Sequence, residues 1–342
     1  MIHHVGQEFE AADTGGGRFS RRDLLKSLGV GVVGTGLGLG LNIRSAIAQS
    51  DSNAADDVLA FYRLQVGEIE VTVIHDGPIG FPPPFLAVNA PEEDVLALMR
   101  DHDLGTDFAP LSVGIVLIRS GDHLVLVDTG SGTSTFATDF FGNNIGHLIP
   151  TLEMMGVTPG DITDVIFSHY HPDHLGGTSS DNGLLFPNAQ HYLPQVEWEY
   201  LQSDGIDEFL VPFVGFAQQQ LQPLAASDGQ LRFYGDEDEV VSGIQAMSTF
   251  GHSAGHHSFM LESNGQQLLL SVDVFAHHIL HLRHPDWFAG VDQIPDVAVA
   301  TRQQLLKRIA DEKMQILAFH FPFPGIGHIL PDGEAYRFVP TA

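Results

Sequence analysis

The segment DVIFSHYHPDHLGG, residues 164–177, limits the folds open to this chain more than any other part of the sequence. Its first four residues read as a short buried strand that runs directly into three histidines and an aspartate. His169 and His171 alternate along the extended backbone and therefore point to the same side. The proline that follows fixes its own φ and turns the chain, so Asp173 and His174 project from the next turn. The spacing predicts one pair of ligands for each of two cations.

Two cations need more ligands than these, and later strand ends supply candidates. Predicted strands over IQAMST and QQLLLSV are followed by His252 and Asp273, and QILAF runs into His320. The chain has 19 histidines and no cysteine, so imidazole and carboxylate must do all the metal binding. The lack of cysteine also excludes disulfides and thiolate nucleophiles. The candidate ligands are His169, His171, Asp173, His174, His252, Asp273 and His320.

The order of the remaining elements favours a layered α/β fold, in which helices cover stacked sheets. Strands are expected over residues 61–77, 113–130, 164–167, 244–250, 258–263, 266–275 and, as the last strand, 315–320. Helices are expected over residues 143–156, 195–201 and 297–313. Residues 205–225 mix Phe and Pro with Gln and are ambiguous; a lid over a pocket is one reading.

The N-terminus reads as an export signal. The basic segment SRRDLLK, residues 20–26, precedes an apolar, glycine-rich stretch and then the small-residue pattern A-x-A that ends at Ala48. The apolar stretch is too short and too rich in Gly for a stable membrane-spanning helix. Arg21 and Arg22 resemble a twin-arginine signal, which the twin-arginine export machinery reads on folded proteins. We expect cleavage after Ala48, a periplasmic or secreted location and one domain over residues 49–342; an uncleaved anchor is the alternative.

The charge balance limits the partners of the chain. The formal net charge is −28, from 15 Lys and Arg against 43 Asp and Glu. Such a surface repels nucleic acid and anionic lipid and disfavours highly anionic substrates, although a bound metal overrides this locally. We therefore expect no nucleic-acid partner and a small neutral substrate. A homodimer stays open.

Together these motifs resemble the metallo-β-lactamase superfamily. The resemblance rests on H-x-H-x-D-H at 169–174, LVDTG at 126–130, G-H-S-x-G-H at 251–256, and the later Asp273 and His320. The tail HFPFPGIGHILPDGEAYRFVP, together with FYRLQVGEIEVTVIHDG and FPNA, is similar to the methyl parathion hydrolase-like branch. The resemblance implies a four-layer αβ/βα sandwich with a dinuclear metal site at one edge of its two sheets.

The resemblance also implies a role for each ligand. Three histidines would hold one ion, an aspartate and two histidines the other, and Asp273 would bridge them. Zinc suits this set, and manganese, iron or cobalt is tolerable. Asp128 would orient a ligand imidazole, although an aspartate in a turn is nearly as simple a reading. The two sets are His169, His171 and His252 for the first ion, and Asp173, His174 and His320 for the second.

Such a centre predicts hydrolysis without a covalent intermediate. Two ions lower the pKa of a shared water from about 15.7 to roughly 7, which provides a metal-bridging hydroxide at neutral pH. Asp273 would hold the ions together, and Asp173 would orient the hydroxide or carry a proton to the leaving group. A neutral ester, lactone or aryl phosphotriester fits. The branch implies phosphotriesterase or arylesterase/lactonase activity, and an ester or lactone is the preferred physiological substrate.

Side chains outside the ligand set are assigned more loosely. Phe141 falls at the pocket-aromatic position of the branch, and Trp198 is a second candidate for the pocket, although aromatic residues mostly pack in cores. Further pocket candidates are Phe209, Phe213 and Phe216. Structural roles are expected for His256 and His257, a solvated loop with at most one pocket contact for His277, His278, His281 and His284, and a turn or core position for His328.

Other functions remain open at this point. A β-lactamase with a cysteine ligand is excluded by composition, and those without one usually lack the bridging aspartate that Asp273 provides. The net charge and the export signal disfavour a nuclease. Redox members of the superfamily replace a motif histidine with Glu, which this chain does not. An inert metal-binding protein is the reading outside enzymology, and the full ligand set argues against it.

Overall fold

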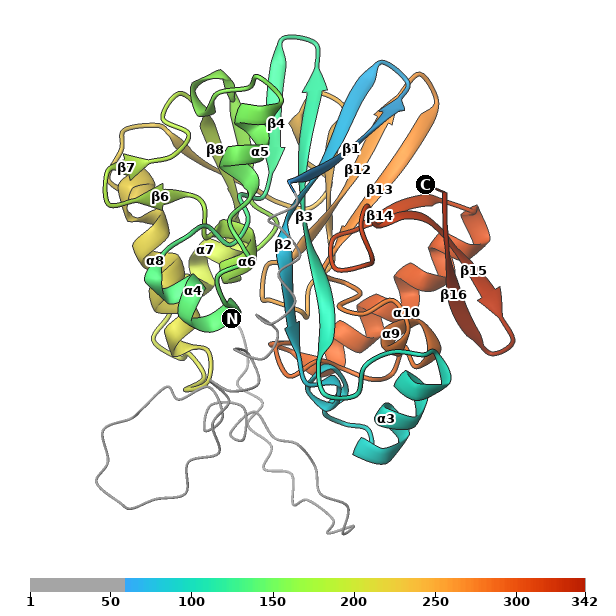
Figure 1. The fold of residues 1–342 in the computed structure, drawn as a ribbon. Helices are drawn as coiled ribbons and strands as arrows, with labels where there is room; N and C mark the ends of the chain where they lie inside the picture. The colour runs from blue at the N-terminus through green and yellow to red at the C-terminus, as the bar shows by residue number, and fades with distance from the viewer. Residues whose placement is uncertain (1–58, 342) are drawn as a thin grey trace, which may run out of the picture.

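A computed structural model describes residues 59–341, which form two seven-stranded mixed sheets and a small two-stranded one (Figure 1). The first sheet runs in the order β1 (Ala60–Val66), β2 (Ile69–Phe81), β3 (Ala109–Ser120), β4 (His123–Val127), β5 (Asp164–Ile166), β8 (Gln190–Pro194) and β9 (Leu231–Tyr234). The second runs in the order β10 (Glu239–Val241), β11 (Ile244–Ser248), β12 (His257–Ser263), β13 (Gln266–Val272), β14 (Gln315–Ala318), β15 (Ile326–Asp332) and β16 (Ala335–Pro340). The third pairs β6 (Ser179–Ser180) with β7 (Gly183–Leu184).

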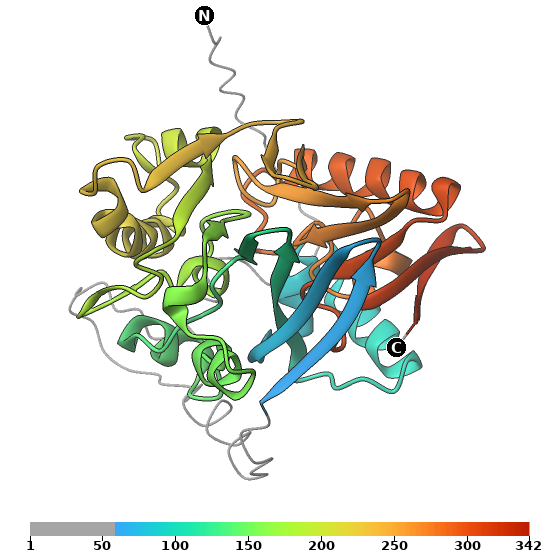
Figure 2. The same cartoon turned by 90° about the horizontal axis from the view of Figure 1, so that it is seen from above.

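Helices lie on the outer sides of the two large sheets, as the view from above shows for α10 beside the second sheet (Figure 2). The α-helices are α3 (Glu92–Asp101), α4 (Thr135–Phe141), α5 (Leu148–Met154), α6 (Pro172–Leu175), α7 (Gln195–Leu201), α8 (Val211–Ala225), α9 (Leu280–Arg283) and α10 (Pro295–Glu312). Two short 3₁₀ helices are η1 (Pro83–Ala87) and η2 (Pro159–Asp161). None of the helices within residues 59–341 combines the length and the hydropathy that crossing a bilayer requires.

Alternation along the strands explains the layers. In β4, Val125 and Val127 face the apolar layer between the two sheets, whereas Leu124 and Leu126 face the layer beneath the helices of the first sheet. In β13, Leu269 faces α10 on the other side of the second sheet. Each such side chain, once fully buried, contributes roughly 1.5–3 kcal/mol. The expected αβ/βα sandwich is confirmed, with its two sheets sharing the central apolar layer.

Two parts of the structure differ from the elements that the sequence predicted. The strand at 315–320 is not the last one, because residues 326–340 form the hairpin of β15 and β16. Tyr336 and Phe338 of β16 pack on the core while Arg337 is exposed, so the period of two was present in the sequence. The helix expected over 143–156 is shorter and begins at Leu148 as α5, because Gly146 has a φ of +78° and interrupts any earlier turn.

Residues 205–225, left ambiguous above, contain the helix α8. Proline stands in its first turn at Pro212, where the missing N–H costs nothing, and a second proline lies near its end at Pro223. Phe213 and Phe216 are buried on the inner face of α8. The expected export signal and cleavage site, as well as His3 and His4, lie outside the described residues.

Candidate metal centre

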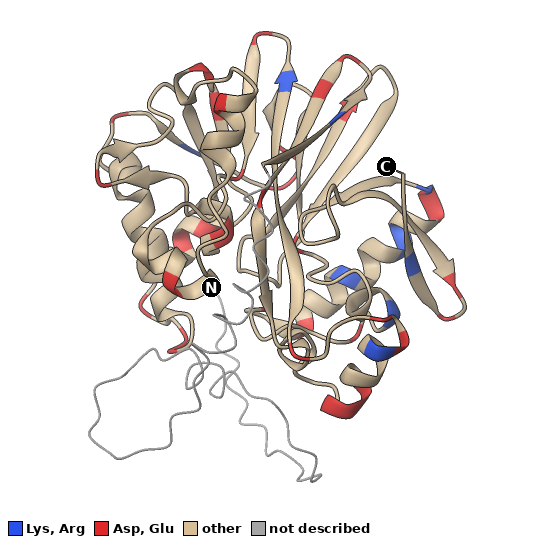
Figure 3. Ribbon diagram, in the orientation of Figure 1, with Lys and Arg blue, Asp and Glu red and all other residues tan. Residues whose placement is uncertain are grey.

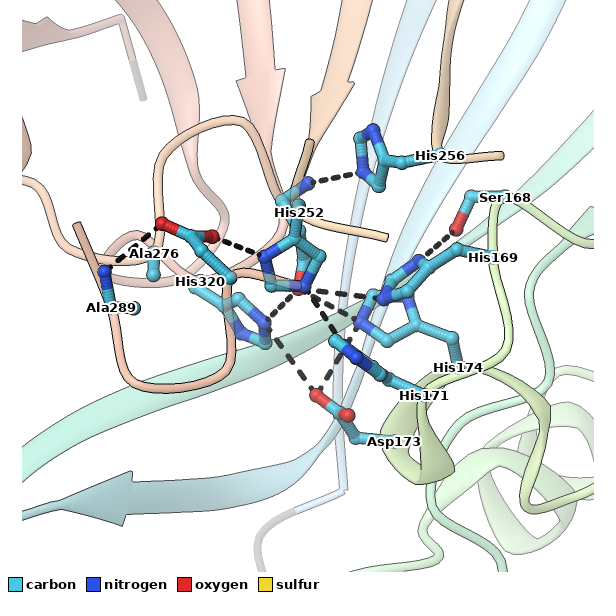
Figure 4. A network of polar contacts seen from close by, with 12 residues as sticks. Ser168, His169, His171, Asp173, His174, His252, His256, Ala276, Ala289 and His320 are labelled. Carbon is cyan, nitrogen blue, oxygen red and sulfur yellow. Dashed lines mark hydrogen bonds and ion pairs between the residues drawn. The ribbon is translucent and has the colours of Figure 1, made fainter. Parts of the chain in front are cut away.

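Strand ends from both sheets meet at one edge of the sandwich. β5 of the first sheet leads into the turn that carries His169 and His171, and β11, β13 and β14 of the second sheet lead into His252, Asp273 and His320. Parallel pairing of β4 with β5 and of β13 with β14 places these ends together. Figure 4 shows the side chains converging from both sheets.

The carboxylate of Asp273 lies at the centre of this cluster. Its Oδ2 is 2.9 Å from Nε2 of His320 and 3.3 Å from Nε2 of both His174 and His252. Nε2 of His169 is 3.9 Å away from the same oxygen. One carboxylate oxygen thus faces imidazoles of both predicted sets, which is the position that a shared ligand requires.

The seven predicted ligands divide into two buried groups. The ligand atoms within each group lie within 4.8 Å of one another, and Asp273 belongs to both groups. The first group is His169, His171, His252 and Asp273, and the second is Asp173, His174, Asp273 and His320. These are the two sets that the resemblance implied.

Unsatisfied atoms test whether divalent ions suit these side chains. Nε2 of His169, Nε2 of His174 and Oδ1 of Asp273 are buried without a hydrogen-bond partner, although buried polar atoms are normally paired. Burial lowers the pKa of His171 to about 3, aided by the neighbouring imidazole of His252. For His252 itself, hydrogen bonds to Asp273 and Asp292 outweigh burial and raise the pKa to about 9, so a bound ion would take the place of a proton there. A neutral imidazole is the form that coordinates a metal. The donors therefore fit two divalent cations.

Asp128 orients two ligands at once. Its Oδ2 accepts a hydrogen bond from Nδ1 of His174 at 2.8 Å. Its two oxygens also accept the backbone N–H and the hydroxyl of Ser168, and that hydroxyl lies 2.9 Å from Nδ1 of His169. Asp128 has a φ of +63°, and such a strained backbone conformation persists where the surroundings enforce it. Its carboxylate thus contacts an imidazole of the second group and, through Ser168, one of the first.

The groups that orient the imidazoles of His252 and His320 were not predicted from the sequence. Oδ1 of Asp292 accepts from Nδ1 of His252 at 2.9 Å, and Oδ2 of Asp292 is paired with the buried guanidinium of Arg302 at 3.0 Å. Nδ1 of His320 donates to the backbone carbonyl of Ser112 at 2.9 Å. Neither Asp292 nor Arg302 belongs to a motif. The one available signal was an arginine on the apolar face of the helix expected over residues 297–313, where Ala298 and Leu306 stand one turn before and after Arg302.

The backbone around Asp273 is also unusual. Val272, a β-branched residue, has a φ of +48°, and the pairing of β13 with β14 shifts register between Leu270 and Val272. The N–H of Asp273 donates to Nε2 of His256 at 3.2 Å. His256, expected to be structural, therefore holds the backbone from which the shared carboxylate projects.

A cavity opens onto the metal-facing atoms. Five of the predicted ligands line it: His171, Asp173, His252, Asp273 and His320. The rest of the lining is apolar: Ile79, Phe81, Leu86, Leu111, Phe140, Phe141, Pro172, Leu210, Phe213, Ala276 and Val291. Among the described residues that line it, none is Lys or Arg.

Only two of the five aromatic residues that were expected in the pocket line the cavity. Phe141 and Phe213 line the cavity. Trp198 is not among the lining residues, because it lies on α7 with its ring against Phe233 at 5.6 Å between centroids. Phe209 and Phe216 are buried behind the wall, where they act as core rather than as lining.

The histidines after Asp273 do not form the solvated loop that was expected. His277 and His281 are buried, and His281 accepts the N–H of Ala276 on one ring nitrogen and donates to the carbonyl of Leu86 with the other. His278 is half-buried, and none of this cluster lines the cavity. His328, expected in a turn or in the core, lies half-buried in the strand β15.

Comparisons with known proteins agree with this geometry. The family model described as the metallo-beta-lactamase superfamily matches residues 109–313, more than half of the chain. An N-acyl homoserine lactonase of Bacillus thuringiensis is 25% identical over 246 residues, which cover 67% of this chain and 86% of that protein.

Two solved structures are similar along most of their length. One is AidC, a dizinc quorum-quenching lactonase in complex with the product N-hexnoyl-L-homoserine, with a TM-score of 0.77, 26% identity, and coverage of 84% of this chain and 99% of that one. The other is AbOPH, a hydrolase in the beta-lactamase superfamily, with a TM-score of 0.76, 26% identity, and coverage of 83% and 98%.

Proposed function

This chain belongs to the metallo-β-lactamase superfamily and is a metal-dependent hydrolase with sites for two ions, and from that premise we propose that it opens neutral lactones, with zinc as the metal. The observation that carries the proposal is the cavity, in which ligand side chains of both groups lie against an otherwise apolar wall. Similarity to lactonases in sequence and in structure supports the same substrate class.

Charge supports a neutral substrate. Asp and Glu are spread over many loops and strand ends of the described chain, while Lys and Arg are few (Figure 3). Because none of the described side chains that line the cavity is Lys or Arg, an anionic substrate finds no ammonium or guanidinium group in its wall. An apolar wall instead desolvates the hydrocarbon part of an ester or lactone, at roughly 25 cal/mol for each Å² that is buried.

The residues of the chain divide the remaining work. When bound, two divalent ions supply a water of lowered pKa and polarise the carbonyl oxygen under attack. Asp273 ties the two groups of ligands together, and His171 and His252 line the cavity beside it. We assign to Asp173, which lines the cavity, a proton transfer: its carboxylate would accept the proton of the attacking water and pass it to the leaving alkoxide as the acyl C–O bond breaks.

A comparison of substrates on one metal-defined preparation tests this proposal. We expect kcat/KM on an N-acyl homoserine lactone or dihydrocoumarin to exceed that on methyl paraoxon by at least about tenfold, which is ~1.4 kcal/mol of transition-state binding. p-Nitrophenyl acetate reports the arylesterase alternative and benzylpenicillin the β-lactamase alternative. A hundredfold preference for the phosphotriester would overturn the lactone proposal. Full metal content without turnover of any of them would favour an inert metal-binding protein.

We also propose that the twin-arginine route exports the chain to the periplasm or beyond. The proposal rests on the sequence SRRDLLK alone, since these residues lie outside the described part of the chain. Replacing Arg21 and Arg22 together with Lys keeps the charge and removes the arginine pair, so we expect the full-length protein to stay in the cytoplasm. Cell fractionation measures this, with Arg18→Lys as the control. Export of the double variant at the normal level would contradict the route.

A further inference from the structure

Glu197 is a buried carboxylate that the chemistry described so far does not use. It lies on α7 and is fully buried. Its Oε1 accepts the backbone N–H of Tyr170 at 2.9 Å, and its Oε2 accepts the backbone N–H of Gly255 at 2.6 Å. Moving a carboxylate from water into the protein interior costs free energy unless hydrogen bonds compensate it, so the partners of Glu197 indicate what it does.

Both partners of Glu197 belong to loops that carry ligands of the first metal group. Tyr170 stands between His169 and His171, and Gly255 lies three residues after His252. These loops come from different sheets, since the first follows β5 and the second follows β11.

We propose that Glu197 is a positioning residue that clamps these two loops together and thereby sets the spacing of the three imidazoles of the first metal group. The proposal rests on the metal pair of the proposed function and not on the choice of substrate. We expect the first group to be affected more, because both loops held by Glu197 carry its imidazoles. Only the loop of Tyr170 also carries Asp173 and His174, and neither loop carries His320.

The local packing shows that the clamp is built for a close fit. A Cβ added to Gly255 would lie 2.5 Å from the backbone nitrogen of Glu197 and 2.9 Å from its Oε2, so only glycine lets this loop approach α7. On the other side, the ring of Tyr170 packs on that of Tyr200, also in α7, with centroids 5.8 Å apart. Helix α7 therefore holds the H-x-H turn through both backbone and side chain.

The chemistry of the side chain explains why Glu is required. Each carboxylate oxygen accepts one N–H, so both loops are satisfied at once. An amide has a single acceptor oxygen and would turn its NH₂ toward one of the two N–H groups. Glu197→Gln thus keeps the size of the side chain and releases one loop. Burial raises the pKa of Glu197 to about 7, and the N–H groups of Tyr170 and Gly255 oppose this rise because they stabilise the carboxylate.

A purely structural role is the rival explanation, and Asp76 offers a matched control. Asp76 is also fully buried, accepts the backbone N–H of Ser131 and of Leu148, and has a pKa raised to about 7 by burial. Its two partners lie in neither of the loops that Glu197 joins. Asp76→Asn should therefore reproduce the loss of stability without the specific loss at the three-histidine group.

The test is a stepwise titration of metal-free protein with Co²⁺, followed by visible absorption and by metal content after dialysis. His252→Ala and His320→Ala serve as references that each remove a ligand of one group. We expect Glu197→Gln to bind one of its two ions about 10–100-fold more weakly, the range for outer-shell partners of metal ligands. Its spectrum should follow that of His252→Ala and not that of His320→Ala.

A second variant keeps the test independent of the folding of the first. Gly255→Ala retains the carboxylate but forces the loop away from α7, and it should weaken the same ion. The inference is overturned if either folded variant binds both Co²⁺ ions with wild-type affinity, or if Asp76→Asn weakens the same ion equally. Because no substrate is involved, a wild-type protein that holds two ions but hydrolyses no lactone would overturn the proposed function alone.

Discussion

Replacing Asp273 with Ala should lower kcat/KM by about a thousandfold or more, or ~4 kcal/mol of transition-state stabilisation. Oδ2 of this carboxylate lies within 2.9–3.9 Å of four ligand imidazoles, so its removal leaves those imidazoles without the anion that holds them together. We expect the variant to retain close to one ion per chain in place of two. Metal content and initial rates on the lactone, measured on the same preparation, check both effects.

The control for this variant is Asp122→Ala, which removes an exposed carboxylate from the β3–β4 turn. It changes the net charge equally and should leave metal content and rate unchanged. Full metal content and full activity in Asp273→Ala would show that this aspartate is not the shared ligand.

Replacing Arg302 with Met should lower the free energy of unfolding by about 3–5 kcal/mol. Arg302 is 1% exposed and is paired at 3.0 Å with Asp292, which is itself fully buried. Its guanidinium also donates to the backbone carbonyls of Val274 and Trp287. The substitution removes the guanidinium from a buried carboxylate that keeps hydrogen bonds with the N–H of Ala289 and with Nδ1 of His252, so its charge loses the paired cation. Urea denaturation of metal-free protein measures the loss without a contribution from bound ions.

Two further variants separate the causes of this loss. Arg308→Met, on the same helix, removes a surface ion pair with Glu312 and should change stability by no more than ~1 kcal/mol. Adding Asp292→Leu to Arg302→Met removes the stranded charge and should recover much of the stability, yet the ion held by His252 should still bind weakly. A double variant as unstable as the single one would show that the uncompensated charge is not the cause.

The ligand residues were open to prediction because their signals are local. A short strand, a proline and alternating side chains place His169 and His171 on one side without reference to the rest of the fold. Asp273 and His320 were also predictable, because each follows a run of apolar residues typical of a buried strand. The structure brings all seven predicted ligands together at one edge of the sheets.

Predictions were wrong where the sequence carries no local signal for the structure. The hairpin of β15 and β16 was not predicted because prolines and glycines interrupt the pattern over residues 321–333, although β16 itself alternates. The histidines after Asp273 were expected in solvent because their partners lie far away along the chain. His281, for example, is satisfied by the carbonyl of Leu86, 195 residues away along the chain. Charge and polarity alone would place such a side chain at the surface.

Local sequence thus sets which side chains are able to bind metal, since strand period and turn chemistry act over a few residues. The supports of those side chains depend on long-range packing. Asp292 meets His252 across 40 residues, and Glu197 meets the two ligand loops across 27 and 58 residues. No periodicity links positions so far apart, because the contacts arise only when two sheets close on a common core and bury a few charged groups between them.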